Sequence, residues 1–345
     1  MTSTPAAPPT NRVGLTKQDY VGSKSTLCPG CGHDAITSQI IAAAWEMSLE
    51  GHMVAKLSGI GCSSKSPAYF LNQSWGFNSV HGRAAAIATG TALANKNLKN
   101  ILVSGDGDSM SIGMGQLVHL IRRNVPVGYI LEDNGVYGLT KGQFSATADL
   151  GSTLKHGEVN HIPPIDPCSL AIELGCGFVA RAFSGSPKQL NAILRAAMAY
   201  EGCAIIDVIS PCVTFNNHES STRSYKNAKD HEMPLQDLGF VPYYDLDEVD
   251  IPAGEAREVS LPDGSRLTLR ALHEDFDPTD RFAAHKAVFE AHQRGEFLTG
   301  ILHIKTEQKT LHDYMHIMDA PLATLPQAAV KPGPEVLAAC MRELM

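Results

Sequence analysis

The sequence lacks any apolar run close to the roughly 20 residues that a membrane-spanning helix requires. Its beginning, MTSTPAAPPTNR, lacks the apolar core of an export signal, so we expect a flexible lead-in and a cytoplasmic protein. Positive charge is also scarce, because 28 Lys and Arg against 36 Asp and Glu give a formal net charge of −8. That balance argues against a broad nucleic-acid-binding surface. We therefore expect neither a membrane nor a nucleic acid among the partners.

Eight cysteines are present without an export signal, so they do not look like a disulfide framework. Cys28 and Cys31 form a C-x-x-C pair in STLCPGCGHD, which suits zinc, a redox-active dithiol, haem attachment or half of an iron–sulfur ligand set. Haem attachment requires C-x-x-C-H, but His33 follows Cys31 after one intervening residue. A catalytic dithiol would leave Cys62 and Cys212 unexplained. On the cysteines alone, zinc and an iron–sulfur cluster both stay open.

Strand and helix patterns alternate between about residues 33 and 210. Short apolar runs predict buried strands, and apolar or small residues at helical spacing predict the helices between them. The expected strands are 53–59, 100–107, 125–134 and 203–210, and the expected helices are 34–47 (with Asp34 as N-cap), 82–96, 112–123 and 186–200. This alternation predicts an α/β fold with a mostly parallel sheet and helices on both faces.

We expect three parts along the chain: the flexible lead-in 1–25, an α/β domain 26–215, and a C-terminal extension 216–345 of loops, a hairpin and helices. Within the extension, Pro262-Asp263-Gly264 predicts the turn of a hairpin over 258–270. Residues 273–295 predict a capped helix. We expect the extension to contact another subunit.

Polar residues follow two neighbouring strands of the predicted sheet. Gly105-Asp106-Gly107 follows one strand and opens into a helix, and Asn134 follows the next strand, in EDNGVYG. Both would lie at the carboxyl ends of parallel strands, where ligands bind. Carboxylate, amide and backbone carbonyl oxygens suit Mg²⁺, which normally binds a few protein groups together with substrate phosphates. A G-D-G tripeptide alone is commonly just a tight turn, but this spacing from Asn134 is typical of a thiamine-diphosphate (TPP) site.

Two nucleotide-binding motifs are missing at this turn. The chain has no P-loop, and GDGDSM lacks the third glycine of a dinucleotide-binding fingerprint.

Six segments over about residues 25–217 jointly resemble the β subunit of the 2-oxoacid:ferredoxin oxidoreductases. They are CPGCGH, GIGCSSK, HGRAAAIATG, GDGDSMSIG, EDNGVYGLTKGQFSAT and ISPCVTFN. Through NSVHGRAAAIATG and NNHESSTRSYK the chain is most similar to the branch that oxidises 2-oxoglutarate. The resemblance implies the thiamine-diphosphate-binding fold.

The resemblance also implies a role for each matching residue, with a [4Fe–4S] cluster and Mg²⁺ held close to TPP in the domain 26–215. The cluster ligands would be Cys28, Cys31, Cys62 and Cys212; the Mg²⁺ ligands would be Asp106, Asn134 and the Val136 carbonyl; the TPP site would be lined by Ile60, Gly61, Cys62, Ser63, His81, Gly107, Asp108, Gly138 and Leu139. The α subunit of this family usually completes the TPP site and supplies the glutamate that activates the cofactor. No matching glutamate is visible in this chain.

The implied reaction is the coenzyme A-dependent oxidative decarboxylation of 2-oxoglutarate to succinyl-CoA and CO₂, or its reverse. One cluster would pass electrons to ferredoxin, since the chain holds no second C-x-x-C-x-x-C run. The implied partners are an α subunit, ferredoxin, the 2-oxoacid and coenzyme A, in an αβ heterodimer or a dimer of heterodimers. Pyruvate and branched-chain 2-oxoacids stay open as substrates. Two alternative functions stay open. One is a non-oxidative TPP decarboxylase subunit with structural zinc, and the other is a redox-sensing or scaffold protein that has lost catalysis.

Two basic residues are candidate catalytic residues. Lys65, in GCSSK, could contact an anionic group of the substrate or of coenzyme A, and a solvated surface lysine is the alternative. His81 could hydrogen-bond a phosphate, and helix capping is the alternative. Arg223, Lys226 and Lys229 form a basic cluster that could receive an acidic ferredoxin, although such a run is more often a solvated face.

Overall fold

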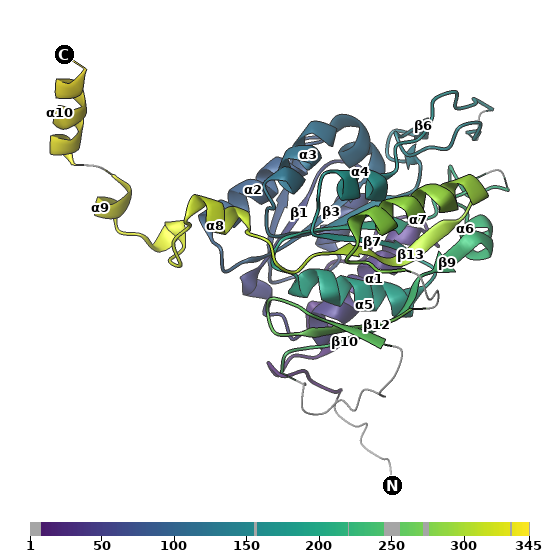
Figure 1. The fold of residues 1–345 in the computed structure, drawn as a ribbon, viewed down its shortest axis with the longest axis horizontal. Coiled ribbons are helices and arrows are strands. Elements are labelled where there is room, and N and C mark those ends of the chain that lie inside the picture. Colours follow the sequence, from purple (N-terminus) through teal and green to yellow (C-terminus); the bar gives the residue numbers. More distant parts are fainter. Residues whose placement is uncertain are drawn as a thin grey trace, which may run out of the picture.

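The expected parallel sheet lies at the centre of the computed structural model (Figure 1), which describes residues 8–154, 157–219, 221–244, 256–271, 276–331 and 333–344. Its eight strands follow the order β2-β1-β3-β4-β8-β7-β13-β9. The strands are β1 (Val54–Ser58), β2 (Trp75–Asn78), β3 (Lys99–Gly105), β4 (Val127–Asp133), β7 (Phe178–Phe183), β8 (Cys203–Ile209), β9 (Glu232–Pro234) and β13 (Phe297–Ile304). Pairings from β2 to β7 are parallel, whereas β13 runs antiparallel to β7.

Helices cover both faces of this sheet, as expected (Figure 1). On one face lie α1 (Gly32–Glu46) and α5 (Pro187–Ala199), which pack on each other. The other face carries α2 (Ala84–Ala94), α3 (Met114–Arg122), α4 (Pro167–Glu173) and α7 (Arg281–Arg294). The sheet therefore separates two apolar cores, one beneath each helical layer. Both faces of the central strands are buried, which explains their continuous apolar sequences.

The first helix begins earlier than expected. It starts at Gly32 with Cys31 as the N-cap, so the prediction of Asp34 as N-cap was wrong. The chain already turns at the C-x-x-C segment, where the Cys31 N–H donates to the Cys28 carbonyl at 3.0 Å. The Asp34 carboxylate accepts instead from the Ser25 hydroxyl at 2.6 Å.

The observed sheet crosses the boundary expected at residues 215 and 216. Strands β9 and β13 belong to the extension, yet β13 pairs with β7 and β9 pairs with β13. At the other end of the chain, residues 8–25 pack on the domain: the Tyr20 side chain is buried, and its hydroxyl donates to the Leu49 carbonyl at 2.7 Å. Residues 1–7 of the expected flexible lead-in lie outside the described residues.

The expected hairpin is present as β11 (Ala256–Ser260) and β12 (Arg266–Ala271), antiparallel to each other and joined by β10 (Gln236–Val241) into a small sheet beside α5. The expected capped helix is α7, which begins after Asp280 and ends at Gly295. The remaining strands and α-helices are β5 (Val136–Tyr137), β6 (Gln143–Phe144), α6 (Tyr225–His231), α8 (Leu311–Met315), α9 (Gln327–Val330) and α10 (Pro334–Glu343). No helix in the described ranges is long and apolar enough to cross a membrane.

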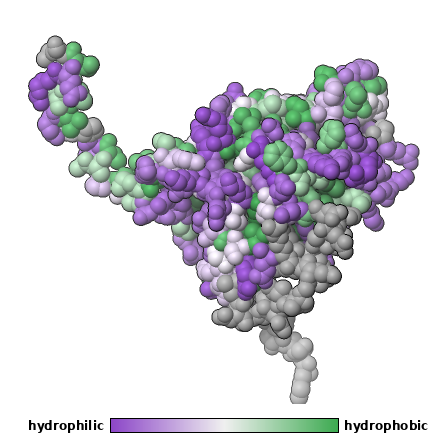
Figure 2. Space-filling view, in the orientation of Figure 1, coloured by the Kyte–Doolittle hydropathy of each residue, from purple (hydrophilic) through white to green (hydrophobic). Residues whose placement is uncertain are grey.

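The last helices form an arm that projects away from the body (Figure 1). In the space-filling view the arm carries apolar residues among hydrophilic ones (Figure 2). Leu337, Met341 and Leu344 are all exposed and recur at helical spacing on and just after α10. The arm therefore presents an apolar stripe that its own chain does not cover.

A substitution at Gly300 tests whether β13 contributes to the stability of the central sheet. The Gly300 φ of +119° disfavours any residue with a side chain, and a Cβ there would lie 2.3 Å from Gln236 Oε1, which also accepts from the Ile301 N–H. We expect Gly300→Ala to lower the free energy of unfolding by about 1–3 kcal/mol in urea denaturation. Gly90→Ala in α2 is the control, because its Cβ meets no atom within 4 Å; it should stabilise by about 0.4–1 kcal/mol. Equal stability of the Gly300 variant and the wild type would contradict the role of β13.

Candidate functional site

A cleft lies where β1, β3 and β4 end. Most of its wall comes from the loops that follow these strands, with His33 of α1 and His81 after β2 beside them. The cleft therefore lies at the carboxyl ends of the parallel strands. It is lined by His33, Ile60, Gly61, Cys62, Ser63, His81, Gly105, Asp106, Gly107, Asp108, Asn134, Val136, Tyr137, Gly138, Leu139 and Thr140. The structure thus brings together all the residues expected to hold Mg²⁺ and all those expected to line the TPP site.

Asp106 and Asn134 come from the ends of adjacent parallel strands, β3 and β4. Both side chains are buried and border the cleft together with Val136. The Asn134 Oδ1 accepts the Val136 N–H at 3.0 Å, which curls the chain so that both residues face the cleft. The spacing argument from the sequence therefore placed this pair correctly.

The Asp106 carboxylate is held by a dense set of donors. Its Oδ2 accepts the Gly135 N–H at 2.9 Å, the Thr147 hydroxyl at 2.7 Å and the Ser145 hydroxyl. Burial, and then the neighbouring Asp133 carboxylate, raise the pKa of Asp106 to about 7. A cation beside this oxygen-rich group would favour its charged form. The donor set therefore fits Mg²⁺.

Asp108 holds the walls of the cleft in place. Its Oδ1 accepts the Ile60 N–H at 3.1 Å and the Gly82 N–H at 2.7 Å, while Oδ2 accepts the Ser104 hydroxyl at 2.7 Å. The His81 Nδ1 lies 2.5 Å from the same Oδ1, without the angles of a hydrogen bond. Asp108 thus borders the cleft and ties three chain segments together.

Several groups in the cleft could hold the diphosphate of TPP. The Ser63 side chain is buried, and its hydroxyl has no hydrogen-bond partner among the described residues. The Tyr137 hydroxyl donates to the Gly107 carbonyl at 3.0 Å, which closes one side of the cleft. An orphaned hydroxyl and a half-exposed imidazole at one cleft suit an anionic ligand.

The four candidate cluster ligands gather beside the cleft. Cys28 and Cys31 precede α1, Cys62 follows β1, and Cys212 follows β8. A side chain at Gly138 would lie 3.3 Å from the Cys62 sulfur and 3.9 Å from the Cys212 sulfur. Burial raises the pKa of the thiols of Cys31, Cys62 and Cys212, and the charges of neighbouring cysteines of this set raise it further, so these side chains lie close together. Cys62 also lines the cleft, so it joins the two halves of the site.

Backbone and side-chain contacts fix the loops that carry these cysteines. The Gly32 N–H donates to the Pro211 carbonyl at 3.2 Å, and the Thr214 hydroxyl donates to the Cys28 sulfur at 3.3 Å. As the side chains stand, no three or more His, Cys, Asp or Glu residues in the described part of the chain are close enough to hold one metal ion. A [4Fe–4S] cluster binds each thiolate at a different iron, so its ligands spread around the cluster and do not meet at one atom. Thiolate donors of this number fit such a cluster.

The other cysteines lie elsewhere. Cys168, Cys176 and Cys203 are buried in the apolar core between the sheet and α4. Burial raises the pKa of the thiols of Cys168 and Cys203 well above its usual range. Cys340 is exposed on α10, in the arm. None of these four cysteines lines the cleft.

The structure places the basic residues that the sequence singled out. Lys65 is half-buried and is not among the described residues that line the cleft. Burial raises the pKa of the Cys62 thiol, and the charge of Lys65 offsets part of that rise, which places Lys65 near this cysteine. That Lys65 contacts the substrate or coenzyme A stays a prediction. The prediction that Arg223 belongs to an exposed basic cluster was wrong. Arg223 is buried, with its guanidinium paired to Asp133 and Asp149, whereas Lys226 and Lys229 are exposed. Local charge in the sequence does not reveal partners 74 and 90 residues away.

The sequence did not reveal a buried polar group that extends from His33, on the wall of the cleft, to Glu132 and Ser210. The His33 Nδ1 lies 2.6 Å from the Ser210 hydroxyl and 3.4 Å from Glu132, and burial lowers the pKa of His33 to about 4. Burial raises the pKa of Glu132 well above its usual range. The signal was an acidic residue at the end of an apolar strand, in YILEDN. Glu132 does not border the cleft, so it is not the missing activating glutamate.

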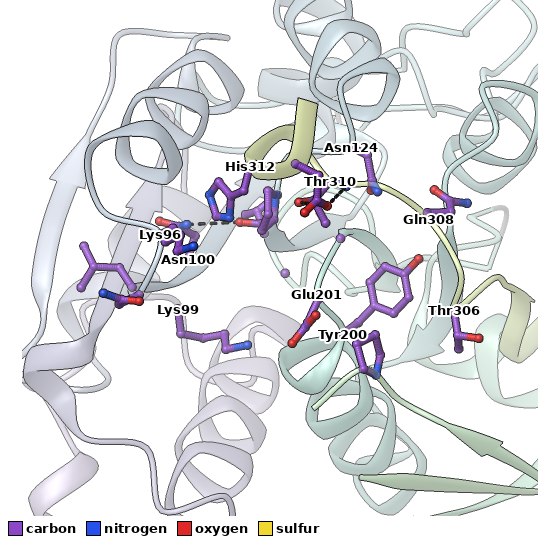
Figure 3. Close-up of a pocket in the computed structure, with 18 residues that line it drawn as sticks. Lys96, Lys99, Asn100, Asn124, Tyr200, Glu201, Thr306, Gln308, Thr310 and His312 are labelled. Carbon is purple, nitrogen blue, oxygen red and sulfur yellow. Dashed lines mark hydrogen bonds between the residues drawn. The ribbon is translucent and has the colours of Figure 1, made fainter. Parts of the chain in front are cut away.

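A larger cavity lies at the opposite edge of the sheet. It encloses about 400 Å³ and is bordered by the starts of β3, β4 and β8 and by the segment before α8 (Figure 3). Lys99, Asn100, Tyr200 and His312 are among the side chains around it (Figure 3). None of the residues expected to hold a cofactor borders it. Size alone therefore does not identify the functional site in this fold.

Asp108 provides a test of the cleft's construction. Asp108→Ala removes an acceptor for two backbone donors and one hydroxyl, so we expect the free energy of unfolding to fall by about 3 kcal/mol or more, since such bonds to charged groups contribute about 1.5–3 kcal/mol each. Urea denaturation measures this loss. Asp237→Ala, at an exposed position, should stay within about 0.5 kcal/mol of the wild type. A similarly small loss for Asp108→Ala would contradict its role as a tie.

Comparisons with known proteins agree with this site. Residues 59–208 match the C-terminal TPP-binding domain of thiamine pyrophosphate enzymes. The chain is 42% identical over 193 residues to 2-oxoglutarate oxidoreductase subunit KorB of Mycobacterium tuberculosis; the match covers 55% of this chain and about half, 51%, of that relative. It is 36% identical over 256 residues to the 2-oxoacid:ferredoxin oxidoreductase subunit beta of a Sulfolobus species, covering 72% of this chain and 81% of the relative.

A solved structure extends the similarity over nearly the whole chain. The 2-oxoglutarate:ferredoxin oxidoreductase from Magnetococcus marinus, with 2-oxoglutarate, coenzyme A and succinyl-CoA bound, matches with a TM-score of 0.74 and 29% identity. The match covers 96% of this chain and 99% of that chain. The TPP-binding domain and the sequence identity across four fifths of the Sulfolobus relative agree on one assignment. The chain belongs to the family of 2-oxoacid:ferredoxin oxidoreductase beta subunits.

Proposed function

We propose that this chain is the beta subunit of an enzyme that converts 2-oxoglutarate and coenzyme A to succinyl-CoA and CO₂, or runs the reverse reaction, with ferredoxin as the electron carrier. One observation carries the proposal. Cys62 borders the cleft that holds Asp106 and Asn134, and it also approaches Cys212 across Gly138. A cofactor site and a thiol cluster thus share a wall. The Magnetococcus marinus structure contains 2-oxoglutarate, coenzyme A and succinyl-CoA, which supports the choice of 2-oxoglutarate as the substrate.

In this proposal the carboxyl edge of the sheet holds Mg²⁺ and TPP. Asp106, Asn134 and the Val136 carbonyl would bind the metal, and the Ser63 hydroxyl would donate to the diphosphate. Bound TPP supplies an electron sink for decarboxylation of a 2-oxoacid. The chain's own contribution is to orient these ligands: Asp108 fixes the loops that carry Ile60 and Gly82, on either side of the cleft.

Cys28, Cys31, Cys62 and Cys212 would hold a single [4Fe–4S] cluster, which transfers electrons singly. Cys62 would place the cluster against the cleft, where oxidation takes place. Cys28 is exposed, so the opposite side of the cluster would face a docking ferredoxin. Lys65, near the Cys62 thiol, would lie on the cluster side of the site.

The small size of the cleft supports the proposal that an alpha subunit is needed to complete the cofactor site. The cleft encloses only about 60 Å³ in this chain, whereas small-molecule sites commonly enclose about 300–1,000 Å³. Ile60 and Leu139 on the cleft are exposed apolar side chains, and two further exposed apolar side chains lie next to its lining: Val80 precedes His81, and Ile112 lies against Gly82. A second chain seated on these side chains would enclose the cofactor and bury the apolar surface. The exposed stripe on the C-terminal arm would contribute a further subunit contact, in an αβ heterodimer or a dimer of heterodimers.

A substrate panel tests this function. The chain, co-purified with its alpha subunit, should reduce ferredoxin fastest with 2-oxoglutarate and coenzyme A together, and should release CO₂. Faster reduction with pyruvate or a branched-chain 2-oxoacid would move the proposal to that substrate. Release of CO₂ without ferredoxin reduction would contradict the oxidative function and favour a non-oxidative decarboxylase.

Replacement of one cysteine tests the cluster. Cys28→Ser removes a thiolate, so we expect the complex to lose its bound iron and the broad visible absorbance of an iron–sulfur protein, and ferredoxin reduction to disappear. TPP binding should persist, because Cys28 does not border the cleft. Cys340→Ser, on the exposed arm, should retain full iron content. Zinc in the wild-type protein, or unchanged iron in Cys28→Ser, would contradict the assignment.

A further inference from the structure

A chain of buried polar contacts leads from Asp106 to Arg223, which lies in a different segment of the sequence. The Thr147 Oγ1 lies 2.7 Å from the Asp106 Oδ2 and 2.7 Å from the Asp133 Oδ1. Its one hydroxyl hydrogen can be donated to either carboxylate. Arg223 meets Asp133 from the other side: Nε donates to Oδ1 at 3.0 Å and one terminal NH₂ group donates to Oδ2 at 3.2 Å.

All three nitrogens of the Arg223 guanidinium donate hydrogen bonds to buried or half-buried side chains. The side chain of Asp133 is 0% exposed and that of Arg223 is 7% exposed. The second terminal nitrogen donates to the Asp149 Oδ2 and to the Thr222 Oγ1, at 3.0 and 3.1 Å. A planar fork that bonds two carboxylates at once holds its partners more rigidly than a lysine ammonium would.

These contacts determine the orientation of the Asp106 carboxylate relative to the cleft. The Gly135 N–H and the Ser145 hydroxyl donate to its Oδ2. The Thr147 hydroxyl, which lies between this oxygen and Asp133, links it to the Asp133–Arg223 pair. No described residue donates a hydrogen bond to the Asp106 Oδ1, so that oxygen is left for a cation. Asp106 and Asp133 are also two buried carboxylates side by side, and the positive charge of Arg223 offsets their mutual repulsion.

We propose that Arg223 is a positioning residue for the metal site: through Asp133 and Thr147 it sets the orientation of the Asp106 carboxylate and thereby the affinity of the site for Mg²⁺ and TPP. This inference rests on the proposed function, which makes Asp106 a metal ligand. Residues behind the direct ligands of a metal commonly change its affinity by about 10- to 100-fold when they are replaced.

A second buried arginine provides a matched control. The side chain of Arg181 is 2% exposed and pairs with Asp166 and Asp207, much as Arg223 pairs with Asp149 and Asp133. Both arginines line the same cavity of about 310 Å³. In the part of the chain that is described, Arg181 makes no hydrogen bond to Asp106, Thr147 or Asp133. Its replacement disturbs a similar ion pair without removing a hydrogen bond from Asp106, Thr147 or Asp133.

The test compares three variants of the full chain in complex with its alpha subunit: Arg223→Lys, Thr147→Val and Arg181→Lys. Calorimetric titration of TPP at several Mg²⁺ concentrations gives the dissociation constants, and thermal unfolding gives stability. We expect Arg223→Lys and Thr147→Val to raise the dissociation constant by about 10- to 100-fold. Arg181→Lys should lower the melting temperature but leave the dissociation constant within about twofold of the wild type.

The outcomes separate the inference from the function on which it rests. If the wild-type complex binds no TPP in a Mg²⁺-dependent manner, both the proposed function and the inference fail. If the wild type binds but Arg223→Lys and Thr147→Val lose only stability, as Arg181→Lys does, the inference alone is overturned. Thr147→Val keeps the shape of the side chain and keeps Arg223 in place, so it remains decisive if Arg223→Lys does not fold.

Discussion

The structure depends on burying several carboxylates at one edge of a parallel sheet. The ends of β3 and β4 are adjacent, so Asp106 and Asp133 come together away from water. Buried like charges repel each other strongly unless a cation or hydrogen-bond donors compensate. Arg223 and Thr147 provide this compensation from loops far along the sequence. The same arrangement that costs folding energy creates a site suited to a divalent cation.

The proposed assembly with an alpha subunit and a ferredoxin would account for the openness of the site. The cleft is small, Ile60 and Leu139 on it are exposed and apolar, Cys62 forms part of its wall, and Cys28 reaches the surface. Placed between an alpha subunit and a ferredoxin, this chain would exclude water on the cofactor side while exposing the cluster side. Low dielectric surroundings and a short electron path would then occur within the same few loops.

The sequence predicted the central layers well, because continuous apolar runs mark strands buried on both faces and the spacing of Asp106 and Asn134 follows from neighbouring parallel strands. It did not predict β13, although FLTGILHI is apolar, because no local signal tells which sheet edge an antiparallel strand will join. Arg223 was misplaced for a related reason. Its neighbours Lys226 and Lys229 are exposed, and the carboxylates that bury it come from other loops. The position of β13 in the sheet and the burial of Arg223 both depend on contacts between residues far apart in the sequence, which local patterns do not show.

The central claim is that one edge of this sheet couples a TPP site to an iron–sulfur cluster in the same chain. Electron paramagnetic resonance of the wild-type complex, incubated anaerobically with 2-oxoglutarate and coenzyme A without ferredoxin, tests it most directly. The account predicts that the signal of a reduced [4Fe–4S] cluster grows on addition of the two substrates, with no other reductant present. A cluster that dithionite reduces but the substrates do not would contradict the coupling.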